Sequence, residues 1–170
     1  MSTRKISSVV GVTTAVLLIL SAISAATTTI SSYAQTIPPI FHAILEGEEE
    51  VPPVDTDAKG AAIFRTSNDE TELNYRLIVG NIEDVTAAHI HLAPRGENGP
   101  VVAFLFDPEE PTEGLTNGVL AEGTITSADL VGPLEGATLS ELIDEMEAGN
   151  TYVNVHTVEH PSGEIRGQIS

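Results

Sequence analysis

The sequence predicts an all-β domain: an antiparallel β-sandwich or flattened Greek-key barrel of about eight strands, with one short helix near 138–148. Three observations lead to this fold class. Short runs alternate apolar and polar residues with period two, turn residues separate these runs, and a single segment shows a helical period. The chain contains 14 Gly and 10 Pro, which supplies the turns, and its hydrophobic content of 41% is enough for a packed core.

Eight runs have the length and residue types of strands. They are 41–45, 61–65, 72–79, 85–92, 101–106, 119–126, 151–158 and 164–169. We expect Gly80-Asn81 to end the third strand, and we expect 159–163 to be the turn of a closing hairpin.

The predicted helix begins after Thr138 and ends at Gly149. Thr138 and Glu141 have the spacing of a capping box, and glycine is favoured just beyond the last helical turn. One apolar stripe follows the helical period: Leu139, Leu142, Ile143 and Met146. We therefore expect this helix to cover an open end or an edge of the sheet structure.

Residues 1–34 have the form of a secretory signal peptide. Arg4 and Lys5 precede an apolar run over 9–26, and Ser32-Tyr33-Ala34 gives a small-x-small pattern for cleavage. The alternative is an uncleaved N-terminal membrane anchor, because the run approaches the length of a membrane span. Both place the domain at 40–170 outside the cytoplasm, extracellular or at the cell surface, with membrane contact only through an uncleaved N-terminal segment.

The charge and the missing residue types exclude several functions. The chain carries 7 Lys+Arg against 25 Asp+Glu, a formal charge of −18, so a nucleic-acid partner is not expected. It contains no Cys, which excludes disulfides, thiolate metal sites and a cysteine nucleophile. No calcium loop, phosphate-binding loop or hydrolase nucleophile motif is present.

Four of the five histidines lie in two clusters that predict a metal site. His89 and His91 are separated by one residue in a predicted strand, so their side chains share one face. His156 lies on the face of its strand opposite Val153 and Val155, and His160 lies at the hairpin turn. Imidazole suits copper, zinc, iron and nickel, and copper(II) binds most strongly in the divalent series. We favour copper, with zinc as the alternative; without a metal, these histidines are polar residues on a solvent-facing surface.

Arg166 is a further candidate, one of only five cations outside 1–34. It has two predicted roles: to pair with a local acid such as Glu164, or to draw an anion toward a nearby metal.

Several segments resemble the CHRD domain, a module named after the developmental regulator chordin and also common as a stand-alone exported domain in prokaryotes. The similarity covers nearly all of 40–170. Its segments are Leu45-Glu46-Gly47, Glu50-Val51-Pro52-Pro53, Gly60, Thr86-Ala87-Ala88-His89-Ile90-His91, Gly96-Glu97-Asn98-Gly99-Pro100-Val101-Val102, Gly149 to Thr157, and Pro161 to Gln168. The resemblance carries over to His89, His91 and His156, whereas His160 is less regular in the family.

A weaker likeness is to copper/zinc superoxide dismutase, which also combines an H-x-H strand with a distant strand histidine and a late arginine. The chain lacks the disulfide and the zinc loop of that family, so the likeness supports copper binding rather than dismutation.

These observations leave three hypotheses. The first is an exported domain that binds a metal, copper favoured, through His89, His91, His156 and His160, for metal binding, storage or delivery rather than catalysis. The second is a structural or adhesive module that binds another extracellular protein without metal. The third is a redox enzyme of the dismutase type.

Overall fold

The computed structural model describes residues 38–170. The predicted signal peptide or anchor at 1–34 lies outside the described residues. Within the described part of the chain, no helix is long and apolar enough to cross a membrane.

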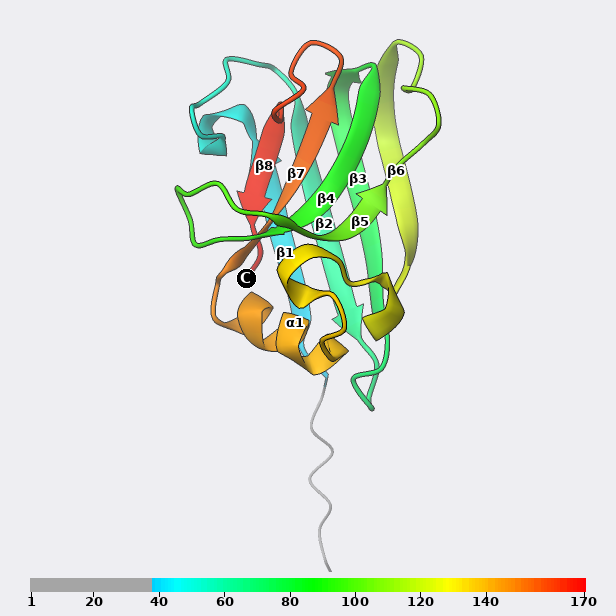
Figure 1. The fold of residues 1–170 in the computed structure, drawn as a ribbon. Coiled ribbons are helices and arrows are strands. Elements are labelled where there is room, and N and C mark those ends of the chain that lie inside the picture. Colours follow the sequence, from blue (N-terminus) through cyan, green and yellow to red (C-terminus); the bar gives the residue numbers. More distant parts are fainter. Residues whose placement is uncertain (1–37) are drawn as a thin grey trace, which may run out of the picture. The chain divides into compact units, whose positions relative to one another are not determined.

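Eight strands and one α-helix make up the domain (Figure 1). The strands are β1 (Ile40–Glu46), β2 (Lys59–Thr66), β3 (Leu73–Glu83), β4 (Val85–Leu92), β5 (Val101–Phe106), β6 (Leu115–Ile125), β7 (Thr151–Thr157) and β8 (Ile165–Gln168). Helix α1 spans Leu139–Glu147, and three short 3₁₀ helices are η1 (Gly47–Glu49), η2 (Ser127–Asp129) and η3 (Gly132–Leu134).

All strands belong to one antiparallel sheet in the order β5-β4-β7-β8-β1-β2-β3-β6. The sheet curls until its two edge strands approach each other, which gives a nearly closed barrel (Figure 1). Across the remaining gap, the Tyr75 hydroxyl on β3 donates a hydrogen bond to the Leu105 carbonyl on β5 over 2.8 Å. The backbone N–H of Val131 also bonds to the Val102 carbonyl, so the segment before η3 covers part of the β5 edge.

The period-two alternation places one face of each strand inside the barrel. Leu45, Phe64, Leu77 and Ile90 are fully buried there, and burial of each such side chain stabilises the fold by about 1.5–3 kcal/mol. Helix α1 packs its apolar stripe, which includes Leu142, against one end of the barrel (Figure 1).

The prediction of an all-β domain with about eight strands and one helix is confirmed. Two predicted boundaries are wrong: β3 continues through Gly80-Asn81 to Glu83, and β6 begins at Leu115 rather than at 119. Asn81 adopts a φ of 54°, and the pairing of β3 with β6 shifts register between Val79 and Ile82. The irregularity therefore acts as a bulge that bends the strand without ending it.

Candidate metal centre

The pairing of β4 with β7 brings three histidines from distant parts of the sequence together. His91 pairs with Tyr152, His89 with Asn154 and Ala87 with His156. His156 is therefore the diagonal neighbour of His89 on the adjacent strand, a position within reach of a long side chain. Because His89 and His91 are two residues apart on β4, all three rings lie on the same face of the sheet.

The three rings are close enough to share one ion. One nitrogen from each of His89, His91 and His156 lies within 4.8 Å of the other two. The Nδ1 of His89 is 3.2 Å from the Nε2 of His156, and two nitrogens bound tetrahedrally at zinc distances are about 3.4 Å apart. The two ligand nitrogens that are farthest apart, at no more than 4.8 Å, would have to approach by at most about 1.4 Å to reach this separation.

Backbone carbonyls orient two of the rings with their free nitrogens toward the cluster. The Nδ1–H of His91 donates to the Gly99 carbonyl over 2.9 Å, and the Nδ1–H of His156 donates to the Pro161 carbonyl over 3.1 Å. Each bond leaves Nε2 with its lone pair, and the Nε2 of His91 is buried without a hydrogen-bond partner. Such second-shell bonds fix the tautomer of a histidine that binds a metal.

The third ring, His89, is hydrogen-bonded to the His156 ring. Because Nε2 of His156 carries a lone pair, the Nδ1–H of His89 donates to it. An ion bound between the two would take the place of this proton, and His89 would then carry its proton on Nε2.

The environment keeps these histidines neutral. Burial lowers the pKa of His89 to about 4, helped by the charges that His156 and His91 would carry if protonated. Burial also lowers the pKa of His91 and of His156, although the bonds to Gly99 and Pro161 act in the opposite direction. Neutral imidazole is the form that binds metals, so the cluster does not need to lose charge at neutral pH.

Aromatic side chains form the walls around the cluster. Phe104 on β5 meets the His89 ring edge to face with 4.9 Å between ring centroids. Tyr152 stacks on the His91 ring with 4.8 Å between centroids, and the Arg166 guanidinium lies over the Tyr152 ring, 4.7 Å from its centroid. These contacts fix the rotamers of His89 and His91 from the side.

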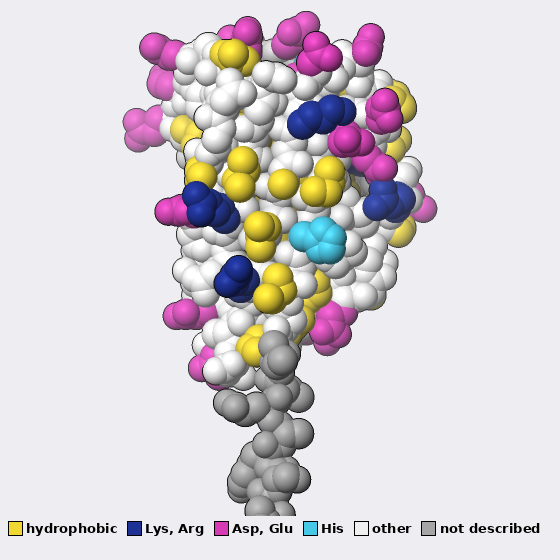
Figure 2. All heavy atoms as spheres, turned by 180° about the vertical axis from the view of Figure 1, so that it is seen from behind, with side chains coloured by type: hydrophobic (Ala, Val, Ile, Leu, Met, Phe, Trp, Pro, Cys, Tyr) yellow, Lys and Arg dark blue, Asp and Glu magenta, His cyan; other side chains and the backbone are white. Residues whose placement is uncertain are grey.

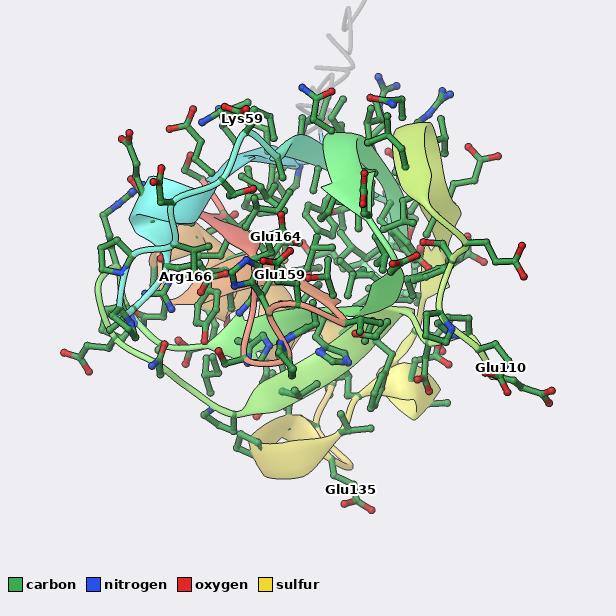
Figure 3. All side chains as sticks on the ribbon, turned by 90° about the horizontal axis from the view of Figure 1, so that it is seen from above. Lys59, Glu110, Glu135, Glu159, Glu164 and Arg166 are labelled. Carbon is green, nitrogen blue, oxygen red and sulfur yellow. The ribbon has the colours of Figure 1, made fainter. Side chains whose placement is uncertain are left out.

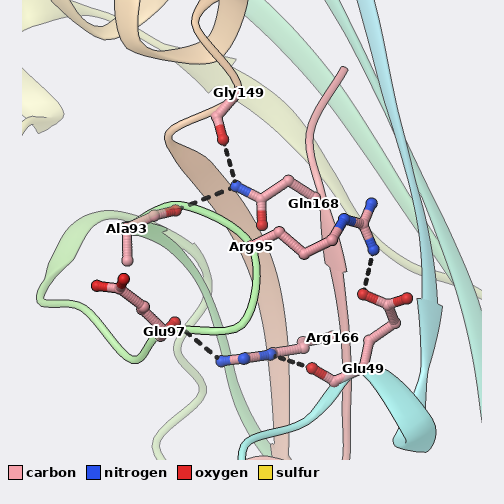
Figure 4. Close-up of polar contacts among 7 residues, drawn as sticks. All are labelled: Glu49, Ala93, Arg95, Glu97, Gly149, Arg166 and Gln168. Atoms are coloured by element: carbon pink, nitrogen blue, oxygen red, sulfur yellow. Dashed lines mark hydrogen bonds and ion pairs between the residues drawn. The ribbon is translucent and has the colours of Figure 1, made fainter.

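Arg166 does not form the predicted pair with Glu164. It is only 3% exposed and donates to the backbone carbonyls of Glu49 and Glu97 (Figure 4). It also donates to the Asn98 side chain. Glu164 instead accepts bonds from the Thr56 and Thr157 hydroxyls. The prediction that Arg166 pairs with Glu164 is therefore wrong. Instead, the hydrogen bonds of Arg166 hold the 47–57 and 94–100 loops against β8.

These two loops also change the surroundings of the histidine face. The alternation along β7 places Tyr152, Asn154 and His156 on a face that the pattern alone leaves toward solvent. In the structure Tyr152 and Asn154 are buried, and His91 is only 8% exposed, because the loops cover that face. The cluster thus lies between the sheet and its covering loops.

His160 lies apart from this arrangement. The structure places it in the β7–β8 turn, where its backbone N–H donates to the Thr157 hydroxyl and its carbonyl accepts from Gly163. Its ring is not among the three whose nitrogens converge.

A buried carboxyl group beside the cluster could not be found from the sequence. Glu50 in the 47–57 loop and Asn154 on β7 each have a buried side-chain oxygen, Oε1 and Oδ1, without a hydrogen-bond donor. Both oxygens border Gly163, where a Cβ would lie 2.6 Å from the first and 2.5 Å from the second. Burial raises the pKa of Glu50 to about 7, partly offset by the Arg166 charge and the Val51 N–H.

Sequence reasoning also missed Gly99, Pro161, Phe104 and Tyr152 as parts of the site. Two of them act through backbone carbonyls, which carry no residue-specific signal. The Gly-rich and Pro-containing segments around Gly99 and Pro161 were the only available hint.

The sequence of the domain is similar to sequences of known proteins. Chordin from Xenopus laevis is 29% identical over 133 residues, which cover 74% of this chain but only 12% of chordin. No solved structure matches the chain. The model of the CHRD domain family matches residues 41–169, from the first residues of β1 to the end of the barrel. The chain therefore belongs to the CHRD domain family.

Proposed function

We propose that this domain binds a single metal ion, copper favoured, through His89, His91 and His156. The observation that carries the proposal is the convergence of three neutral imidazole nitrogens, two of them oriented by backbone carbonyls. Such a donor set suits copper or zinc, and copper stands higher in the order of divalent affinities. Cysteine is absent, so the donor set has no competing thiolate.

The role we propose is metal binding, storage or delivery outside the cytoplasm. The signal-like segment at 1–34 and the sequence similarity to chordin support export of the protein. A surplus of carboxylates over the domain raises the local concentration of cations around it. His160 remains a candidate fourth ligand that would have to turn toward the cluster from the β7–β8 turn.

Metal titration tests the proposal. The purified protein is titrated with copper(II), copper(I) and zinc(II) in competition with a chelator of known affinity. We expect one tight site, with affinity lowered at least 100-fold in the His89→Ala and His156→Ala variants.

The matched control is His42→Ala, because His42 is an exposed histidine on β1 outside the cluster. His160→Ala separates a three-histidine from a four-histidine site. Circular dichroism and thermal unfolding check that each variant is folded. Equal copper affinity and stoichiometry in the native protein and in a variant without all three cluster histidines would refute the proposal.

The second candidate is an extracellular protein-interaction module in which the cluster is structural. The sequence similarity to chordin, a much longer protein, supports this second candidate. It requires that no metal be retained by protein isolated from its source, which elemental analysis measures directly.

A further inference from the structure

The outward face of strands β1, β2, β3 and β6, here called the outer face, carries exposed apolar side chains. In the register of these strands, Ile44, Ala61, Ile78 and Val119 form a row across the sheet. Ile44 is 60% exposed, and Ile63 in the adjacent row is also exposed. Figure 2 shows hydrophobic side chains gathered at the centre of this face. A contiguous apolar patch with a polar border is typical of a contact surface.

The border of the outer face contains most of the positive charge of the domain. Residues 38–170 hold five Lys and Arg against 25 Asp and Glu, and Arg166 is buried. Lys59, Arg65 and Arg76 occupy outward positions on β2 and β3. Figure 2 shows Lys and Arg side chains around the hydrophobic centre of this face. Lys59 and Arg76 form exposed ion pairs with Glu46 and Glu122, at 3.6 and 3.8 Å, and such exposed pairs hold their partners weakly.

The combination of exposed apolar side chains and cations on the outer face limits the kind of partner that can bind there. Two copies of the outer face would present the same cations to each other, and Glu46 and Glu122 on that face already pair with Lys59 and Arg76 within each copy. An anionic membrane would meet Glu46 and Glu122 and would repel a strongly acidic domain. A polypeptide segment that carries both carboxylates and an apolar residue matches the cations and the apolar row together.

The chain itself contains such a segment, the acidic loop between β5 and β6. Residues 107–115 include two prolines and no Lys or Arg. The loop carries four acids, Asp107, Glu109, Glu110 and Glu113, and it leads into Leu115, which is 58% exposed. Figure 3 shows Glu110 pointing away from the barrel, so its carboxylate is available to another molecule.

We propose that the outer face binds the acidic 107–115 loop of a second copy of this chain. Carboxylates of the loop contact Arg65 and Arg76, and Leu115 packs on the row that contains Ile44. Repulsion between two acidic domains is screened within about 8 Å at physiological ionic strength, so these local contacts decide the outcome.

Sedimentation equilibrium at protein concentrations up to about 1 mM, where weak association is populated, tests the proposal. We expect association at physiological salt that weakens when the salt concentration is raised. A face variant, Arg65→Glu with Arg76→Glu, and a loop variant, Glu109→Lys with Glu110→Lys, should each associate at least tenfold more weakly, because like charges then meet.

Mixing the two variants provides the decisive measurement. The reversed loop of one variant then faces the reversed face of the other, so the equimolar mixture should associate more tightly than either variant alone. Glu135→Lys is the control, because Glu135 is an exposed acid that Figure 3 shows pointing outward from η3.

Three results would overturn the proposal. They are a native protein that stays monomeric over the whole concentration range, association that neither double variant changes, and binding of phosphatidylglycerol vesicles by a monomeric native protein that the face variant loses. Thermal unfolding of every variant verifies that lost association does not reflect a lost fold.

Discussion

Replacement of Glu50 by glutamine should stabilise the protein at neutral and alkaline pH. The Glu50 side chain is only 5% exposed, and its Oε1 has no hydrogen-bond donor. Burial raises its pKa from 4.5 to about 7, which means that the folded protein favours the protonated carboxyl. A glutamine at this position would keep the size of the side chain, remove the buried charge and supply an N–H donor.

The size and sign of the effect follow from linkage. A carboxyl group whose pKa is higher in the folded than in the unfolded state stabilises the fold most below pH 4.5. This stability is lost as the pH rises through about 7. The difference between 4.5 and about 7, at 1.36 kcal/mol per pKa unit, gives a loss of up to about 3 kcal/mol. The charge on Arg166 has already reduced this loss, because it lowers the pKa of Glu50.

Urea unfolding of the native protein and the Glu50→Gln variant at a series of pH values measures this loss. The difference in unfolding free energy should be small near pH 4 and should grow to about 2–3 kcal/mol in favour of the variant by pH 8. Glu48→Gln, in the same loop but exposed, is the matched control and should leave the pH dependence unchanged. Parallel pH profiles for the native protein and the Glu50→Gln variant would refute the reasoning.

Other predictions concern the cluster, the helix and the core. Because burial lowers the pKa of all three cluster histidines, that of His89 to about 4, zinc affinity measured by competition should begin to fall at a lower pH than in a site of exposed histidines. Phe104→Ala should expose the His89 ring and move its pKa upward toward 6.5, as measured by an NMR titration of the metal-free protein; an unchanged pKa would contradict the shielding. Thr138→Ala should lower the unfolding free energy by about 1 kcal/mol through loss of the capping box, and Leu77→Ala should lower it by about 2–5 kcal/mol; denaturant unfolding checks both values.

The sequence predicts those features that depend on neighbouring residues. A strand with one buried face shows period two, so the strand cores were recognisable from alternation or apolar runs, and the Thr138–Glu141 spacing located the helix start. The shared face of His89 and His91 is likewise a local property of an extended backbone.

The remaining features depend on long-range pairing that no local pattern encodes. The sheet order places β7 between β4 and β8, so His156 approaches His89 across 67 positions of sequence. The covering of the histidine face depends on loops, whose contacts through Gly99, Asn98 and Arg166 cannot be read from periodicity. For this reason, burial of the cluster and of Glu50 was not predictable, although the identity of three converging histidines was.

Four of the segments that carry the resemblance to the CHRD domain, 86–91, 96–102, 149–157 and 161–168, meet around the histidine cluster. The Gly96–Val102 segment supplies the carbonyl that orients His91, and the Pro161–Gln168 segment supplies the carbonyl that orients His156. The close approach of these segments needs glycine: a Cβ on Gly99 would lie 2.0 Å from the Leu92 carbonyl oxygen, and one on Gly167 would lie 1.9 Å from that of Ile44. Four family segments thus contribute either a ring or an orienting carbonyl to the cluster, or a strand that positions one. Gly99→Ala should lower metal affinity by displacing the carbonyl bonded to His91. An unchanged affinity in the folded variant would show that this segment is not needed for metal binding.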